Sequence, residues 1–318
     1  MQHRVVNTTI FFDYESTWGM PAAMPYDLAS ATTAVLGVLE RHGASAVFNT
    51  TGKIVEDRPE LITRIARAGH EIAIHGYDHT NPAHMTAADN RQFEADLARV
   101  EAKIVELTGT RPVGFRSPHL GAPRFFDAAT YDIFERRGYA WASNREIRFV
   151  DEATSPHVTG RGDVIGLAGK LIGRLGLDRV RLLRRIGLVL LNLDLVWRDQ
   201  TRRPASRVAN LVWLVRRPAP FRRRHLTEFP VLSPLDVDFL SARIDPAQPS
   251  PQSQVDHMVN SLCRLFDEAE EHFNLNFHDW IIGTSNRIDV LDRTVAYIAA
   301  SGRARWVLAR EGLARRRA

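Results

Sequence analysis

Acidic, histidine and arginine side chains recur in four short stretches, each directly after a run of β-like residues. The stretches are 13–15 (Asp-Tyr-Glu), 75–79 (His-Gly-Tyr-Asp-His), 116–121 (Arg-Ser-Pro-His-Leu-Gly) and 278–280 (His-Asp-Trp). The carboxyl ends of parallel strands meet at one edge of an α/β fold, so we expect these side chains to converge there. Carboxylates, imidazoles and a guanidinium gathered in one place can bind a cation and move protons.

The spacing of two histidines indicates a metal site when an acid is added. His75 and His79 are four residues apart, which on one helical turn places both imidazoles on the same side. Such a pair alone is more often a surface or core feature. With a carboxylate from a neighbouring strand end, it forms an open site that leaves room for water and substrate. A divalent cation there polarises a carbonyl, a second carboxylate beside an arginine acts as general base, and another histidine protonates a leaving amine.

The elements that must position these residues alternate along the chain. We expect strands at 9–12, 44–48, 71–74, 112–115 and 139–141, and helices at 28–42, 59–69, 87–107 and 125–137. The alternation stops at about residue 154 and resumes with a strand at 226–231, a helix at 252–272, a strand at 275–277, a helix at 290–300 and a strand at 306–308. Regular alternation predicts parallel strands with crossover helices, hence a barrel or a doubly wound sheet.

The composition is that of a globular protein. The 318 residues are 44% hydrophobic and 25% charged, which excludes a disordered, collagen-like or coiled-coil chain. The length exceeds that of an ordinary domain but fits one α/β barrel. Cys263 is the single cysteine and cannot form an internal disulfide, and the first nine residues lack the apolar run of a secretory signal. These features predict a cytoplasmic protein.

The formal net charge of +5 hides a segregation of charge. Residues 170–225 hold fourteen Arg and one Lys against three Asp, a net +12, and residues 303–318 hold six Arg against one Glu, a net +5. The rest of the chain therefore carries −12. Basic segments on an acidic body indicate an anionic partner, whether a membrane surface, a phosphorylated substrate or nucleic acid, or else a solvated face.

Residues 154–226 interrupt the β/α series and read as a basic, largely helical insertion. Within 171–193, the residues that share one helical side are Arg174, Arg181, Arg184 and Arg185, and those that share another are Leu175, Leu182, Ile186, Val189 and Leu193. This pattern is typical of a helix that lies on an anionic membrane surface, and its apolar run is too short to span a bilayer. Two interpretations stay open: a helical lid over the barrel, or a dock that holds the protein peripherally on the inner membrane face.

Four motifs, taken in order, resemble those of a known family. Asp13-x-Glu15, His75-x-x-x-His79, Arg116-x-Pro118-x-x-Gly121 and Asn276-Phe277-His278 are similar to the motifs of the polysaccharide deacetylases with NodB homology, carbohydrate esterase family four. The resemblance covers residues 8–150 and 226–308. It implies a distorted (β/α) barrel, with residues 1–318 as one deacetylase-like catalytic domain. It also implies a zinc-like divalent metal that serves to hydrolyse an N-acyl group from an amino sugar.

The resemblance also implies residue roles. Asp13 matches the catalytic base, Arg116 the residue that orients it, and His278 the general acid. The matching metal ligands are Glu15, His75 and His79. Substrate binding falls to Pro118 and His119, whose backbone N–H lies where the family stabilises an oxyanion. Trp18 and Trp280, near two strand ends, are candidates for stacking on a sugar ring, although tryptophan is more often a core residue.

Three positions depart from the usual motifs. The first motif is Asp-x-Glu instead of two adjacent Asp, a spacing that resembles a divergent branch with deacetylase-like and allantoinase-like members. Asn276 replaces a leucine. A further motif of the family, expected between the arginine motif and the last one, has no clear copy near 141–151. Asp151 is therefore only a provisional partner for His278.

The leading prediction is a metal-dependent N-deacetylase acting on an amino sugar of a cell-envelope or exopolysaccharide precursor, with a lipid-linked precursor among the options. One alternative is an amidase or deformylase for a small non-sugar amide. Another is a catalytically inactive barrel that binds glycan or lipid. A nucleic-acid binder is least favoured because no recognition motif accompanies the arginines. Zn²⁺ suits two histidines and a carboxylate, but Co²⁺, Ni²⁺, Mn²⁺ and Fe²⁺ use the same ligands. The acyl group, the sugar and the oligomeric state stay open.

Overall fold

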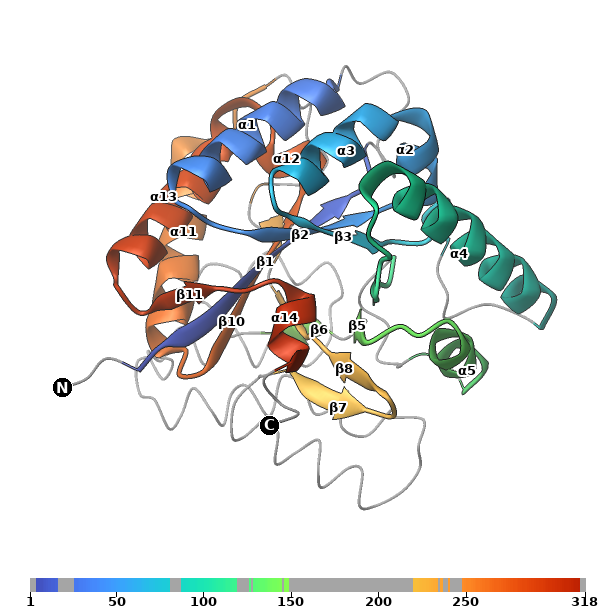
Figure 1. Ribbon diagram of the computed structural model, residues 1–318. Coiled ribbons are helices and arrows are strands. Elements are labelled where there is room, and N and C mark those ends of the chain that lie inside the picture. The colour runs from blue at the N-terminus through green and yellow to red at the C-terminus, as the bar shows by residue number, and fades with distance from the viewer. Residues whose placement is uncertain are drawn as a thin grey trace, which may run out of the picture.

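The computed structural model describes residues 4–16, 26–80, 87–118, 126, 128–144, 146–148, 220–233, 235–236, 240 and 248–314 (Figure 1). Most of the predicted insertion 154–226, including the segment 171–193, lies outside these residues. Trp18, His119 and Asp151 lie outside them as well. The insertion as a unit within one catalytic domain of residues 1–318 therefore stays a prediction.

A mostly parallel sheet of nine strands forms the centre of the described structure. Its order is β10 (His272–His278), β1 (Val6–Tyr14), β2 (Ala46–Thr50), β3 (Glu71–Ile74), β4 (Gly114–Arg116), β5 (Trp141–Ser143), β8 (Leu226–Glu228) and β7 (Phe221–Arg223), and β11 (Ala304–Trp306) also pairs with β1. Only β7 runs antiparallel to its neighbour within this sheet. A separate parallel pair consists of β6 (Glu146–Arg148) and β9 (Val231–Ser233).

The α/β prediction is confirmed, and the barrel is distorted as expected. Among the described residues no ladder of hydrogen bonds joins β7 or β8 back to β10, so the sheet does not close. The segment that holds β9 lies beside β10 at this gap. There, Asn274 Nδ2 donates a hydrogen bond to the carbonyl O of Pro230 at 3.1 Å.

β1 is the strand around which the sheet is built, because it pairs with three others. Its register aligns Asp13 with His278 of β10 and with Asn49 of β2. Nearly every β1 residue is buried, as expected for a central parallel strand that is covered on both faces. Phe12 stacks on Phe48 of β2 with 5.0 Å between ring centroids, so side chains as well as hydrogen bonds fix this pair of strands.

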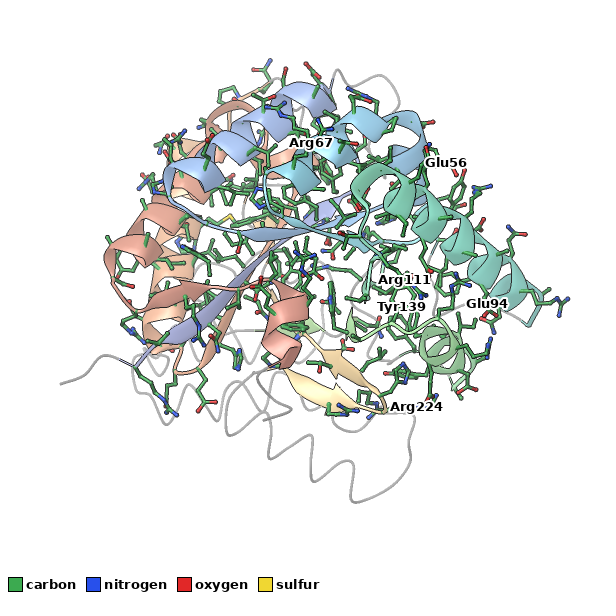
Figure 2. All side chains as sticks on the ribbon, in the orientation of Figure 1. Glu56, Arg67, Glu94, Arg111, Tyr139 and Arg224 are labelled. Carbon is green, nitrogen blue, oxygen red and sulfur yellow. The ribbon has the colours of Figure 1, made fainter. Side chains whose placement is uncertain are left out.

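The helices lie side by side around the sheet in the order α11, α13, α1, α3 and α4 (Figure 1). Their bounds, with those of the smaller helices, are α1 (Leu28–Arg41), α2 (Gly52–Asp57), α3 (Pro59–Arg67), α4 (Ala87–Thr108), α5 (Ala128–Arg136), α11 (Gln252–Glu268), α12 (Asp279–Ile282), η3 (Ser285–Arg287), α13 (Ile288–Ala300) and α14 (Ala309–Ala314). Apolar side chains fill the layer between helices and sheet, whereas charged ones such as Arg67 and Arg224 lie on the outside (Figure 2).

Local signals explain where several helices begin and end. At the start of α1, the Asp27 carboxylate accepts hydrogen bonds from the main-chain N–H groups of Ala29 and Ser30 at 3.0 and 3.3 Å. Helix α3 begins at Pro59, and the chain turns after it at Gly69, whose φ of 86° favours glycine. These predicted boundaries are confirmed to within two residues.

The chain at the end of the predicted insertion differs in detail from the single strand expected at 226–231. The strand expected at 226–231 divides into β8 and β9, because Pro230 has no N–H group with which to continue a ladder. Residues 221–223, which the sequence placed in a largely helical insertion, form β7 and pair antiparallel with β8. No helix among the described residues is long and apolar enough to cross a membrane.

A test of this packing concerns Gly114 on β4. A Cβ atom at Gly114 would lie 1.9 Å from Cε2 of Trp141, so Gly114→Ala should lower the free energy of unfolding by about 3 kcal/mol through overpacking. Urea denaturation measures the change. The matched control is Gly37→Ala within α1, where the nearest atom lies 3.9 Å away and alanine should stabilise the protein by about 0.5–1 kcal/mol. Equal effects of the two substitutions would contradict the close contact.

Candidate active site

Six predicted site residues lie together at the carboxyl edge of the sheet. The six are Asp13 and Glu15 at the end of β1, His75 and His79 after β3, Arg116 at the end of β4 and His278 at the end of β10. The prediction that four strand ends converge is confirmed, because these strands run parallel and end at the same edge.

Glu15, His75 and His79 form a cluster that could hold a metal ion. Oε2 of Glu15 lies 3.1 Å from Nε2 of His75 and 2.8 Å from Nε2 of His79. Glu15 and His75 are buried and His79 is partly buried, with all three ligand atoms within 4.8 Å of one another. His79 is the most exposed of the three, with 11% of its side chain accessible to solvent.

The chemistry of this cluster fits a divalent cation. Nδ1 of His75 lies 3.0 Å from the main-chain O of Arg116, which can only accept a hydrogen bond, so Nδ1 carries the proton. In a neutral imidazole, Nε2 then presents its lone pair to Oε2 of Glu15. A cation between these two electron-pair donors removes their repulsion. Two imidazole nitrogens and one carboxylate oxygen also suit Zn²⁺ and related cations.

A loop, and not the helical turn expected from the sequence, brings the two histidines together. Residues 75–80 form no helix, and both Gly76 and His79 have positive φ, 75° and 64°. These left-handed residues turn the chain so that His79 faces His75. A Cβ atom at position 76 would lie 3.3 Å from Cγ of Pro118, so the ring of Pro118 packs directly over this loop. Buried Pro118 therefore packs against the loop that carries the two histidines, and its predicted role in substrate binding stays a prediction.

Asp13 is buried and held at one of its two oxygens. Its Oδ1 lies 2.7 Å from Nε of Arg116 and accepts a hydrogen bond from Asn49 Nδ2 at 3.2 Å. Its Oδ2 faces Nε2 of His278 at 3.9 Å. The guanidinium of Arg116 in turn donates to Oδ1 of Asn276 at 2.8 Å. Asn276, the departure from the usual leucine, thus anchors the arginine that holds Asp13.

The sequence missed the partner of His278. Asp236 is fully buried, and its Oδ1 lies 2.6 Å from Nδ1 of His278, while its Oδ2 accepts from the His278 main-chain N–H at 2.7 Å. Burial alone would lower the pKa of His278, but the charge and hydrogen bond of Asp236 outweigh it and raise that pKa to about 10. His278 is therefore protonated near neutral pH. The structure gives Asp236 the position for which Asp151 was the provisional candidate.

Trp280 is buried and contacts Glu15 and His278. It is only 7% exposed, its ring lies 5.9 Å from that of His278, and its Nε1–H donates to Oε1 of Glu15 at 3.1 Å. The structure thus places Trp280 beside Glu15, and its stacking on a sugar ring stays a prediction. The predicted contacts of Trp18 and His119 lie outside the described residues.

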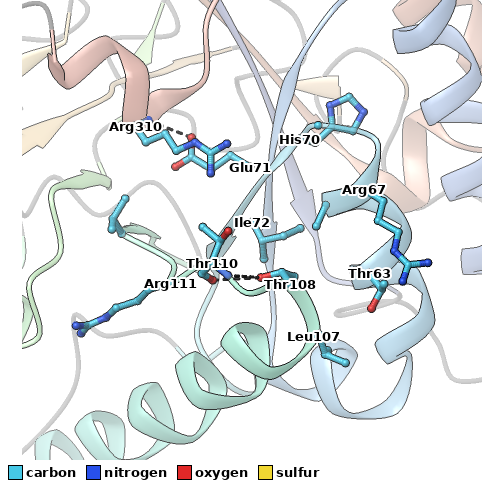
Figure 3. Close-up of a pocket in the computed structure, with 13 residues that line it drawn as sticks. Thr63, Arg67, His70, Glu71, Ile72, Leu107, Thr108, Thr110, Arg111 and Arg310 are labelled. Atoms are coloured by element: carbon cyan, nitrogen blue, oxygen red, sulfur yellow. Dashed lines mark hydrogen bonds between the residues drawn. The ribbon is translucent and has the colours of Figure 1, made fainter.

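A recess of about 470 Å³ lies at the opposite end of β3 (Figure 3). Glu71, Arg111 and Arg310 are among its lining residues. Both oxygens of Glu71 are already bonded, one to Trp141 Nε1 at 2.9 Å and the other to the Arg310 main-chain N–H at 3.0 Å. Glu71 is the first residue of β3, and His75 directly follows its last residue, so the length of the strand separates this recess from the cluster of Glu15, His75 and His79.

Comparison with known proteins confirms the resemblance. Residues 9–140 match the family model described as polysaccharide deacetylase. This part of the chain is therefore similar to a polysaccharide deacetylase domain, and it contains Asp13, Glu15, His75, His79 and Arg116.

Three relatives in sequence each match between 26% and 34% of the chain. A peptidoglycan deacetylase of Helicobacter pylori is 34% identical over 84 residues, 26% of this chain and 28% of that protein. The peptidoglycan-N-acetylmuramic acid deacetylase PdaA of Bacillus subtilis is 32% identical over 90 residues, 28% of this chain and 33% of that protein. An uncharacterised protein of Geobacillus stearothermophilus is 30% identical over 108 residues, 34% of this chain and 38% of that protein. The chain thus matches well under half the length of each relative.

Solved structures confirm the fold. A Mycobacterium smegmatis protein assigned to the polysaccharide deacetylases has a TM-score of 0.61 at 16% identity, with 99% of this chain and 92% of that chain covered. Puue allantoinase has a TM-score of 0.57 at 13% identity, with 99% and 90% covered. At these identities the likeness shows the (β/α) fold alone.

The buried pair of Asp236 and His278 predicts a pH-dependent stability. Because the folded-state pKa of His278, about 10, exceeds its ordinary value of 6.5, the pair stabilises the fold fully below pH 6.5 and progressively less up to pH 10. Asp236→Asn should therefore cost about 3 kcal/mol in unfolding free energy at pH 6 and clearly less at pH 10. Urea denaturation at both pH values measures this.

The control for this experiment is Asp292→Asn. Asp292 lies 2.7 Å from Nε2 of His42 at the surface, where such pairs contribute about 1 kcal/mol or less. If the cost of Asp236→Asn were the same at both pH values, the raised pKa of His278 would be refuted.

Proposed function

We propose that this protein is a metal-dependent hydrolase that removes an N-acyl group, most simply acetyl, from an amino sugar. One observation carries the proposal: Asp13 and His278 face each other across 3.9 Å beside the cluster of Glu15, His75 and His79. A carboxylate and a protonated imidazole at that position can take a proton from water and give one to a leaving amine.

The chain's own residues divide the proton transfers between them. With Oδ1 held by Arg116 and Asn49, Asp13 has Oδ2 left to accept a proton from the attacking water. A divalent cation bound by the cluster supplies the positive charge that polarises the acyl carbonyl and favours ionisation of water. As the C–N bond breaks, His278 donates its Nε2 proton to the amine nitrogen, while its Nδ1–H remains hydrogen-bonded to Oδ1 of Asp236. The products are the free amine and the carboxylic acid.

The substrate class is proposed from the relatives. Two matched proteins are named as peptidoglycan deacetylases, which favours an N-acetylated amino sugar in a cell-wall glycan or its precursor. Zn²⁺ is the proposed metal because two histidines and one carboxylate are its common catalytic ligands. Peripheral docking on the inner membrane face, through 171–193 and the arginine-rich residues 303–318, stays a prediction, since 171–193 lies outside the described residues.

The direct test compares the unaltered protein with His79→Ala. Purified unaltered protein should contain about one metal per chain and release acetate from N-acetylglucosamine oligosaccharides. Loss of one of three ligands should remove the metal and lower the rate more than about 100-fold. Mutating a residue that only hydrogen-bonds to a metal ligand already lowers metal affinity or activity about 10–100-fold. Metal analysis and acetate release are measured on the same samples.

The control for that test is His42→Ala, a histidine whose ion pair with Asp292 lies outside the site. It should keep both metal and activity. Metal without acetate release would move the substrate to another amide, such as a small non-sugar amide. Absence of metal from the unaltered protein would contradict the proposal and favour a binding barrel.

A second substitution distinguishes the proposed proton acceptor, Asp13, from the proposed metal ligands. Asp13→Asn removes the proton acceptor but none of the three clustered ligands, so metal content should stay while the rate falls about 10²–10⁴-fold. Steady-state acetate release with metal analysis checks both. Loss of metal in this variant would show that Asp13 is itself a ligand.

A further inference from the structure

Glu15 is held at both its main chain and its carboxylate by the two residues that follow His278. Its main-chain N–H donates to Oδ1 of Asp279 at 2.9 Å, and its Oε1 accepts from Nε1 of Trp280 at 3.1 Å. Asp279 is fixed from its other side, because Oδ2 accepts a hydrogen bond from the Tyr26 hydroxyl. Glu15, Asp279 and Trp280 are all more than nine-tenths buried.

The strand pairing explains how the two segments come together. β1 and β10 pair in parallel up to Asp13 and His278, the last pair of their ladder. Glu15 follows the end of β1 directly, and Asp279 and Trp280 open helix α12 directly after β10. The contact is therefore made by the two segments that leave the paired strand ends.

The two carboxylate oxygens of Glu15 have different neighbours. Oε2 faces Nε2 of both His75 and His79, at 3.1 and 2.8 Å. Oε1 is turned away toward the Trp280 indole, whose N–H can only donate. A carboxylate held in this way offers one oxygen to the side where the histidines converge.

We propose that Trp280 is a positioning residue that makes Glu15 a one-oxygen ligand. By binding Oε1, the indole N–H keeps that oxygen away from the cation and leaves the coordination position it would take to water and substrate. A catalytic metal site needs such a vacancy, whereas a freely rotating glutamate can bind through both oxygens. This inference rests on the metal site of the proposed function.

The test is the metal affinity of Trp280→Phe, which keeps an aromatic ring and removes the N–H donor. Loss of an outer partner of a ligand should weaken Zn²⁺ binding by about 10–100-fold. Isothermal titration calorimetry with Zn²⁺, in competition with a chelator of known affinity, measures the dissociation constant without reference to turnover.

The chain offers a closely matched control. Trp141 also donates its indole N–H to a buried carboxylate, Glu71, at 2.9 Å, but at the other end of β3. Trp141→Phe removes the same kind of hydrogen bond and should leave the Zn²⁺ dissociation constant unchanged. Thermal unfolding of both variants records how far each substitution weakens the fold. Unchanged affinity in Trp280→Phe, or an equal loss in both variants, would overturn the inference.

A measurement on the unaltered protein does not depend on any variant folding. A crystal structure with Zn²⁺ should show Oε2 of Glu15 on the metal and Oε1 still on the Trp280 indole. Zinc chelated by both oxygens would overturn the role of Trp280 while leaving the metal site intact. Failure of the unaltered protein to bind Zn²⁺ in the calorimeter would instead overturn the proposed function.

Discussion

The pairing of β1 with β10 is the interaction on which the candidate site depends. Its parallel register sets Asp13 opposite His278, so the groups that can take and give a proton face each other. Directly beyond this ladder, the Trp280 indole N–H donates to Glu15. A slip of one residue would turn every side chain of the strand to the opposite face. One ladder of hydrogen bonds therefore fixes Asp13 and His278, the proposed base and acid, relative to one another.

Burial of the charged groups makes this arrangement rigid. Asp13 is paired with Arg116, and His278 with Asp236, and all four are largely shielded from water. A buried charge without its partner is strongly destabilising, so the folded chain has few alternatives to these contacts. The charges are thus in place before a substrate arrives, which is the condition under which electrostatic stabilisation of a transition state is most effective.

Strong local signals made much of this predictable. Glu71–Ile74 was expected as a strand and forms β3, and the search along strand ends found the six converging residues. Asp236 escaped because its partner His278 is 42 residues away and because it follows the break at Pro230, where the β/α rhythm is lost. It lies shortly after β9, so a search of that strand end would have reached it. The loop that joins His75 to His79 also escaped, since a spacing of four does not distinguish a helical turn from a loop with positive φ.

The Asp-x-Glu spacing fits the end of β1, where Tyr14 is the last strand residue and Glu15 follows it. Side chains alternate between the faces of a strand, so Asp13 and Glu15 point to the same side while Tyr14 points away. The Tyr14 hydroxyl lies 2.6 Å from Oγ1 of Thr32 in α1, on the side of the helices. With Tyr14 between Asp13 and Glu15, both carboxylates reach the site. The hydrogen bond from the Glu15 main-chain N–H to Asp279 then joins the two chain segments just beyond Asp13 and His278, the last pair of the β1–β10 ladder.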